Sequence, residues 1–298
     1  TLVESDDLIL DRVVTAGGDV NLTTVAGGGG GLFLGELDAT SGDIILQADG
    51  AIIDDLAGLD TVNLTTSGAA NLTAQLGIGA SAQGDIDTNL GSLSAVNALT
   101  GNLYIHERGD LSVTGGGVVT EAGDGNIALS VVGALTVEDS AAVRAHGGGH
   151  VLLDSGSTLT VGNTFVGSTS GILTVVADGL ITLQANASLA TATTGSILVR
   201  SQNGGLLMDT SASVVATDSD LRVETALTAL IGELSADNIA LVSGASVTAT
   251  AGVLANVTAT SLRVEAAKST GVVAERLRTA VDTLAVKNAH GIFVSQSG

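Results

Sequence analysis

The spacing of short apolar pairs constrains the fold of this chain more than any other sequence feature. Two apolar residues separated by one position recur every eight residues through the centre of the chain, with mostly Gly, Asp, Asn and Ser between them. The clearest series is Ile127/Leu129, Leu135/Val137, Val143/Ala145, Val151/Leu153 and Leu159/Val161. Because alternate residues of a strand face the same side, each pair predicts a short strand with one buried face, and the residues between pairs predict turns.

A longer spacing bears on two all-β interpretations of these strands. Short strands with turns of three or four residues fit either antiparallel hairpins in a β-sandwich or the coils of a parallel solenoid. The strongest strands recur three of the eight-residue steps apart, as Val20 and Ile44 do, and Ile197 and Leu221. Three strand-and-turn steps would therefore complete one coil. We predict an all-β, right-handed parallel β-helix with about 24 residues and three short strands per coil.

The predicted coils stack through their apolar residues, and Ile127, Ile197 and Ile239 are expected in the core. At the usual distance between paired strands, roughly 12 coils would give a rod on the order of 60 Å long. The segment 273–284 also fits a helix, because Val, Leu, Val and Leu recur there at helical spacing among good helix formers. Against this, Thr279–Asn288 matches Thr88–Asn97 at a constant offset of 191, and that earlier segment is predicted as loop and strand.

A weaker similarity links segments about four coils apart. Thr100–Ile105 resembles Thr194–Val199 at an offset of 94, and His290–Val294 aligns with Gly195–Val199. We predict one continuous solenoid of three tandem repeats, approximately 1–103, 104–198 and 199–298. The chain ends near the phase at which it begins, without a helical or polar cap. Because open coils expose strand edges, we expect either a window on a longer array or a protomer that stacks end to end.

Composition and charge exclude several classes of protein. The chain has no cysteine, so neither a disulfide nor a cysteine-ligated metal is possible. Its 31 acidic and 10 basic residues give a formal net charge of -21. Such a charge argues against nucleic acid and anionic lipid as partners, because both require clusters of Lys and Arg. No apolar run approaches the ~18 residues of a membrane span, so none is expected.

Three segments share a phrase of the form G-[DN]-I-x-L-x-A-x-G-x-I, in whole or in part: Gly42–Ile52, Asn71–Gly79 and Leu93–Ile105. In this respect the chain resembles the filamentous-haemagglutinin-like and giant repetitive adhesins of bacteria. The resemblance covers most of the chain and implies a right-handed β-helix, export, and an extracellular or bacterial cell-surface location. It implies no catalytic residues.

An enzyme that cleaves polysaccharides is a rival interpretation, because some β-helices have that activity. Such chemistry needs a carboxylate pair at a defined separation, or carboxylates with a positioned cation. The adjacent pairs Asp6-Asp7 and Asp54-Asp55 are the nearest matches, and neighbouring residues of a strand face opposite sides. Aromatic platforms for sugars are also scarce, with one Tyr and three Phe in the chain. We therefore expect no catalytic residues.

Two short segments are candidate metal sites. His146 and His150 frame three glycines, but structural zinc usually takes four ligands, so an exposed turn is the favoured interpretation. The segment Ala122–Ile127 is similar to glycine-aspartate calcium turns, which makes Asp124 and Asn126 candidate calcium ligands. The nonapeptide of calcium-binding β-helices is not repeated here. We therefore expect no obligatory cofactor, with calcium as the alternative.

Three functions follow, in order of preference. The first is a non-enzymatic structural rod of an extracellular bacterial adhesin, biofilm matrix fibre or surface filament, whose partners are adjoining repeats or other copies stacked end to end. The second is a binding module with a lateral site for a host or surface carbohydrate or protein. The third is a polysaccharide-active β-helix enzyme, which a groove holding at least three convergent charged side chains would support.

Overall fold

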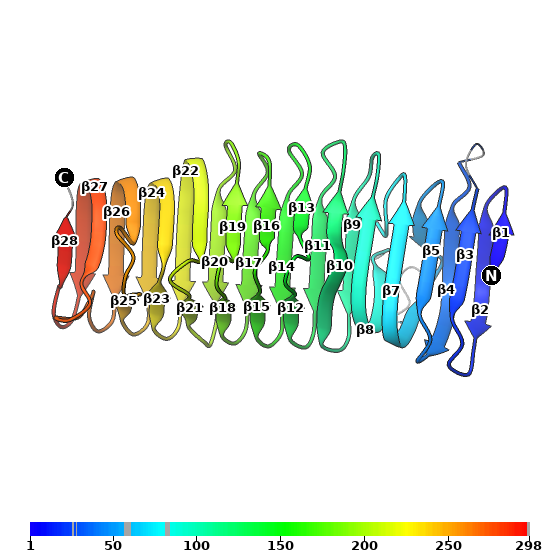
Figure 1. The fold of residues 1–298 in the computed structure, drawn as a ribbon, viewed down its shortest axis with the longest axis horizontal. Coiled ribbons are helices and arrows are strands. Elements are labelled where there is room, and N and C mark those ends of the chain that lie inside the picture. Colours follow the sequence, from blue (N-terminus) through cyan, green and yellow to red (C-terminus); the bar gives the residue numbers. More distant parts are fainter. Residues whose placement is uncertain (26, 28, 57–60, 81–83, 297–298) are drawn as a thin grey trace. The chain divides into compact units, whose positions relative to one another are not determined.

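The computed structural model describes residues 1–298 apart from 26, 28, 57–60, 81–83, 297 and 298 (Figure 1). The described residues form 28 strands and no helix. They divide into two compact units, Thr1–Asp154 and Ser155–Gly298, which we call unit 1 and unit 2. Each unit is a stack of parallel β-coils of about 23 residues.

The strands of unit 1 range in length from 3 to 12 residues. They are β1 (Leu2–Glu4), β2 (Leu8–Val14), β3 (Val20–Thr24), β4 (Leu32–Thr40), β5 (Ile44–Ala48), β6 (Ile52–Asp54), β7 (Leu64–Ala74), β8 (Ile86–Asn97), β9 (Leu103–Glu107), β10 (Leu111–Thr120), β11 (Ile127–Val131), β12 (Leu135–Val137), β13 (Val143–Ala145) and β14 (Val151–Ser155), which ends one residue into unit 2.

The strands of unit 2 are short at first, and its later part contains both long strands and strands of three residues. Its strands are β15 (Leu159–Val161), β16 (Phe165–Ser168), β17 (Leu173–Ala177), β18 (Ile181–Leu183), β19 (Ser188–Thr191), β20 (Ile197–Ser201), β21 (Leu206–Met208), β22 (Ser213–Thr225), β23 (Ala229–Ile231), β24 (Glu233–Ser243), β25 (Val247–Ala249), β26 (Val257–Ala266), β27 (Leu277–Asn288) and β28 (Val294–Gln296).

Strand pairing within each unit confirms the predicted parallel solenoid. In unit 1, Ile127 of β11 lies beside Leu103 of β9, and Leu135 of β12 lies beside Leu111 of β10. In unit 2, Ile197 of β20 pairs with Leu173 of β17 in the same parallel sense. Each of these partners lies one predicted coil length away along the chain. Backbone hydrogen bonds therefore join one coil to the next, and the antiparallel sandwich is excluded as the fold of the described residues.

Coil length is less regular than the sequence spacing predicts. The step from β20 to β22 has the predicted length, since Ile197 pairs with Leu221, but the step from β22 to β24 is shorter, since Leu221 pairs with Ile239. Strand β22 is 13 residues long because it bends across two faces of its coil. Its first part pairs with β19 and its second part with β20. Long bent strands of this kind replace two short strands and the turn between them.

The core is built from alternating small aliphatic side chains, as predicted. Strand β11 alternates buried and half-buried residues, and so do most short strands of both units. Ile127 is 1% exposed, and Ile197 and Ile239 are each 2% exposed. The inward assignment of all three is therefore confirmed. Stacked Val, Leu, Ile and Ala from successive coils remove apolar surface from water, at about 25 cal/mol per Å².

The segment with helical spacing forms a strand. Residues Leu277–Asn288 make up β27, in which Thr279 pairs with Val257 and Leu284 pairs with Leu262 of β26. The helical alternative is wrong because the backbone groups of this segment hydrogen-bond to the preceding coil. The match to Thr88–Asn97 gave the right prediction, since that segment lies within strand β8.

Glycines occupy a corner where successive coils come into close contact. A Cβ added to Gly125 would lie 2.1 Å from the carbonyl oxygen of Gly101, and one on Gly149 would lie 2.2 Å from that of Gly125. In unit 2, a Cβ on Gly195 would lie 2.0 Å from the carbonyl oxygen of Gly171. These positions exclude any side chain, because the neighbouring atom belongs to the backbone.

Inward-facing polar residues lie at strand ends or at bends within long strands, where their side chains bind turn carbonyls. The hydroxyl of Thr66 donates to the carbonyl of Gly42 at 2.6 Å, and the Asn97 amide donates to that of Gly101 at 2.7 Å. These bonds satisfy carbonyls that the coil-to-coil ladder does not reach. Polar side chains at the corners therefore face the core and still form hydrogen bonds.

Glu107 is the most buried carboxylate of the described residues. Its side chain accepts hydrogen bonds from the Thr88 hydroxyl at 2.7 Å, the Leu90 amide at 3.0 Å and the Gly109 amide at 2.7 Å. Burial raises the pKa of Glu107 above its ordinary value, and these hydrogen bonds only partly offset that effect.

This raised pKa predicts a pH dependence of stability. A raised folded-state pKa means that the native protein holds the proton more tightly than the unfolded chain does. The contribution of Glu107 to stability is therefore largest below its unfolded pKa and declines as the pH rises through the folded value. Urea unfolding should show wild type gaining stability over Glu107→Gln on acidification, by about 1.4 kcal/mol for each tenfold difference in proton affinity. A difference that stays constant with pH would contradict the assignment.

Candidate functional site

The two acidic pairs do not form a matched pair of catalytic carboxylates. Asp54 is buried and accepts hydrogen bonds from the Leu56 amide at 2.8 Å and the Asn63 side chain at 2.7 Å, whereas Asp55 is exposed. Asp7 accepts a hydrogen bond from the Gly31 amide of the next coil at 2.8 Å. One carboxylate of each pair therefore has a structural role in the turn that contains it.

The two histidines lie on a turn of unit 1. The Nδ1 atom of His146 lies 2.9 Å from the carbonyl oxygen of Gly123, and the backbone amide of His150 donates to the side chain of Asn126 at 2.8 Å. Both residues are exposed, in agreement with the interpretation as a surface turn. Among the described residues, no three His, Asp or Glu side chains are placed to hold a metal ion.

The calcium candidates belong to a ladder of side-chain acceptors that joins successive coils. Asp124 accepts from the Gly148 amide at 2.8 Å, and Asn126 accepts from the His150 amide at 2.8 Å. Asn126 in turn donates its own backbone amide to the side chain of Asn102 at 2.9 Å. The same bond links Asp19 to Asp43, Asp43 to Ala69, and Asp110 to Ala134. We call these acceptor residues the Asx ladder; in each, a side-chain oxygen accepts a backbone amide of the following coil.

Substitutions at Asp124 can distinguish its role as a hydrogen-bond acceptor from a role as a calcium ligand. If the side-chain oxygen of Asp124 acts only as a hydrogen-bond acceptor, Asp124→Asn should keep wild-type stability, because the amide oxygen of Asn can accept the same bond. Asn126 already accepts a backbone amide of the next coil in this way. Asp124→Ala should lose about 1 kcal/mol, the usual net value of one hydrogen bond. Thermal unfolding with and without a calcium chelator completes the test. A melting temperature that falls on chelation in wild type, but not in Asp124→Asn, would instead assign Asp124 to calcium.

A second charged cluster of unit 1 lies beside β8 and β9. Asp87 and His106 occupy paired positions on these strands, and a guanidinium nitrogen of Arg108 lies 3.9 Å from an Asp87 carboxylate oxygen. Burial raises the pKa of Asp87 above its ordinary value, and the nearby His106 and Arg108 oppose this effect. The cluster contains both acidic and basic groups, but the ion pair between Asp87 and Arg108 is enough to account for their arrangement, and no ligand is needed.

The most regular array of charges lies on unit 2, on outward positions of five successive strands. Strand pairing aligns Arg200, Glu224, Val242, Glu265 and Lys287 in one column across β20, β22, β24, β26 and β27. The adjacent column, two residues earlier on each strand, contains Arg222, Ala240 and Arg263. We call the six ionic residues of these columns the charged face: Arg200, Arg222, Glu224, Arg263, Glu265 and Lys287.

Each glutamate of the charged face lies between two cations. Glu224 binds Arg200 through Nε at 2.5 Å and also forms an ion pair with Arg222. Partial burial opposes ionisation of Glu224, but the hydrogen bonds from both arginines hold its pKa below the ordinary value. Glu265 binds Arg263 at 2.5 Å, and this contact lowers its pKa, with a smaller contribution from Lys287. The result is two triads, each with two positive charges and one negative charge.

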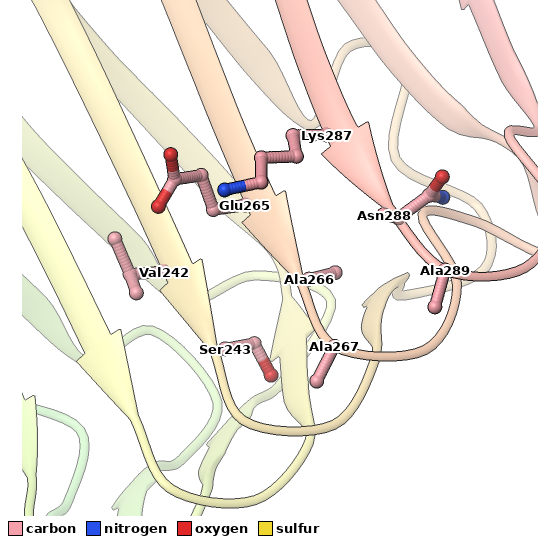
Figure 2. A pocket seen from close by; sticks show the side chains of 8 residues that line it. All are labelled: Val242, Ser243, Glu265, Ala266, Ala267, Lys287, Asn288 and Ala289. Carbon is pink, nitrogen blue, oxygen red and sulfur yellow. The ribbon is translucent and has the colours of Figure 1, made fainter.

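An open hollow adjoins the second triad. Figure 2 shows the Lys287 amine directed toward Glu265 across neighbouring strands, with Val242 on the strand beyond Glu265. The hollow has a volume of about 390 Å³. Its other lining residues are Ser243, Ala266, Ala267, Asn288 and Ala289 (Figure 2). The strand between the triads, β24, carries only Ala240 and Val242 at the equivalent outward positions. Small uncharged side chains therefore separate the two triads.

Sequence reasoning missed the charged face, although a signal was present. The phrase Leu-Arg-Val-Glu occurs at Leu221–Glu224 and again at Leu262–Glu265. The apolar residues of each phrase face the core, so the ionic residues face outward on the same side of the strand. The spacing between the two phrases is not a whole number of predicted coils. Only the shortened step from β22 to β24 aligns them.

Among the described residues there is no helix, and hence none long and apolar enough to cross a membrane. The chain matches no protein-family model, and it has no match among curated proteins or solved structures.

Proposed function

We propose that this chain is a non-enzymatic structural segment of an extracellular bacterial surface protein, such as an adhesin, a matrix fibre or a surface filament. The observation that carries the proposal is the use of polar groups within unit 1. Outward Asp and Asn side chains of the Asx ladder accept amides of the next coil, and inward Thr and Asn side chains bind turn carbonyls. These groups hold neighbouring coils together, and the stability of a solenoid depends on such contacts between neighbouring repeats.

Charge and sequence phrases also support this role. A net charge of -21 keeps such a segment soluble and opposes adsorption onto anionic cell envelopes. The phrases around Ile44, Leu72 and Leu103 resemble those of large secreted adhesins.

The cellular location gives the direct test. Antibodies raised against the chain should label intact cells of the producing bacterium, and brief external protease treatment should remove the label. Cells from which the gene is deleted should lose the label and attach less well to surfaces or to each other. Labelling that appears only after the cells are opened would contradict the proposal.

A lateral binding module is the second candidate, and the charged face of unit 2 favours it. A flat strand surface with two repeated triads offers several cations within reach of one extended partner. This interpretation and the structural role are compatible, because the same segment can hold other parts of a protein apart and bind a partner along its side.

A further inference from the structure

The two units differ sharply in charge. Residues 1–154 contain 21 acidic and three basic residues, for a net charge of -18, whereas residues 155–298 contain ten acidic and seven basic residues, for a net charge of -3. Four of those seven cations lie on the charged face. One chain therefore carries a strongly anionic unit together with a local concentration of cations on the other unit.

The charged face keeps a net positive charge despite its internal ion pairs. Four cations and two glutamates leave a net charge of +2, with one excess positive charge in each triad. Arg222 and Arg263 lie on either side of Ala240, two strand spacings apart, which is about 10 Å. The field of Arg222 reaches Glu265 across this strand and contributes to lowering its pKa. An anionic group seated over Ala240 would meet both triads.

Unit 1 displays carboxylates that suit such a face. Asp19 and Asp43 occupy corresponding turns of successive coils, and Asp110 occupies the same corner of a later coil, whereas Asp124 lies on a different corner. All four are exposed, although each uses one oxygen as an acceptor within the Asx ladder. Asp19, Asp43 and Asp110 therefore place negative charge along one corner of the stacked coils of unit 1, and the first two lie one coil apart.

We propose that the charged face of unit 2 binds the acidic surface of unit 1 on a second copy of this chain, side to side. The partner is a second copy because the complementary charge is part of the same polypeptide and is present at equal concentration. At physiological ionic strength the screening length is about 8 Å, so repulsion between distant charges of two anionic chains is weakened more than attraction between groups in contact. The contact joins unlike surfaces, which leaves each copy able to bind two others and generates open assemblies. The inference rests on the proposed structural role and extends it to lateral assembly.

Sedimentation velocity of the purified chain tests the contact. Larger species should form as protein concentration rises at about 0.15 M salt and should dissociate at about 1 M, where the screening length is about 3 Å. Arg222→Gln/Arg263→Gln removes one cation from each triad and should weaken association about tenfold or more. The matched control, Arg12→Gln/Arg144→Gln, removes two cations from unit 1 and should associate at least as strongly as wild type.

A complementary variant removes charge from unit 1 without removing its hydrogen bonds. In Asp19→Asn/Asp43→Asn/Asp110→Asn, each amide oxygen still accepts the next coil's amide, as Asn102 and Asn126 already do. This variant alone should also associate at least about tenfold more weakly. Mixed with Arg222→Gln/Arg263→Gln, it should form one-to-one pairs and nothing larger, because only one intact surface remains on each partner. Circular dichroism and melting temperature check that each variant is folded.

The outcomes separate this inference from the proposed function. A chain that stays monomeric at all salt concentrations, or a mixture that forms no pairs, would overturn self-association but leave the cell-surface labelling test unaffected. Alginate, a linear polymer of uronic acids, serves as the competing probe. Arginine-dependent binding of alginate by a chain that does not self-associate would assign the charged face to an anionic polysaccharide instead. Labelling confined to opened cells would remove the structural role, whatever the purified chain does.

Discussion

Gly125→Val is expected to prevent unit 1 from folding at its central coils. The new side chain would begin 2.1 Å from the carbonyl oxygen of Gly101, inside the contact distance of any two non-bonded atoms. That oxygen belongs to the backbone of the neighbouring coil, so relief requires the two coils to separate. We expect a loss of about 3 kcal/mol or more in the free energy of unfolding, measured by urea denaturation.

Gly18→Val provides the matched control. No atom lies within 4 Å of a Cβ built at Gly18, and its φ is not in the left-handed region, so the same substitution should change stability by less than about 0.5 kcal/mol. Equal effects of the two variants would show that coil contact at Gly125 is not what excludes a side chain there.

Ile127→Asp should have an effect of similar size for a different reason. Ile127 is 1% exposed among the stacked aliphatic residues of successive coils, and a carboxyl group there would have no polar partner. Burying such a group costs several kcal/mol, so we expect a loss of about 4 kcal/mol or more. Hydrogen exchange should show the coil of β11 and its neighbours losing protection first.

The control for this substitution is the adjacent residue. Ala128 lies on the outward side of β11 and is half-buried, so Ala128→Asp should remain folded with at most a small loss of stability. If Ile127→Asp were as stable as Ala128→Asp, the inward assignment of β11 would be wrong.

The solenoid was predictable from the sequence because its main determinant is local and periodic. The eight-residue steps from Ile127 to Leu159 record which side chains face inward, and groups of three such steps record which of them stack. The prediction was less accurate where coil length changes. Between Leu221 and Ile239 the coil is shorter than predicted, because long bent strands replace two short strands and a turn.

Site prediction failed for the same physical reason. Outward residues become neighbours only through coil register, so the alignment of Arg222 with Arg263 depends on the contracted coil between them. The candidates visible in the sequence were turn residues, and the structure gives Asp124 and Asn126 a coil-joining role. Whether they also bind calcium, and whether the repeats 1–103, 104–198 and 199–298 are true duplications, remain predictions.

The parallel register of neighbouring coils has an evolutionary consequence. Each coil, such as the one that begins with β11, pairs through one strand edge with the preceding coil. It presents an edge of the same kind to the following coil. A gene that gains or loses the codons for one whole coil would therefore join matching edges again. Recombination between similar coils could lengthen or shorten such a protein stepwise, with each product inheriting a core that already fits.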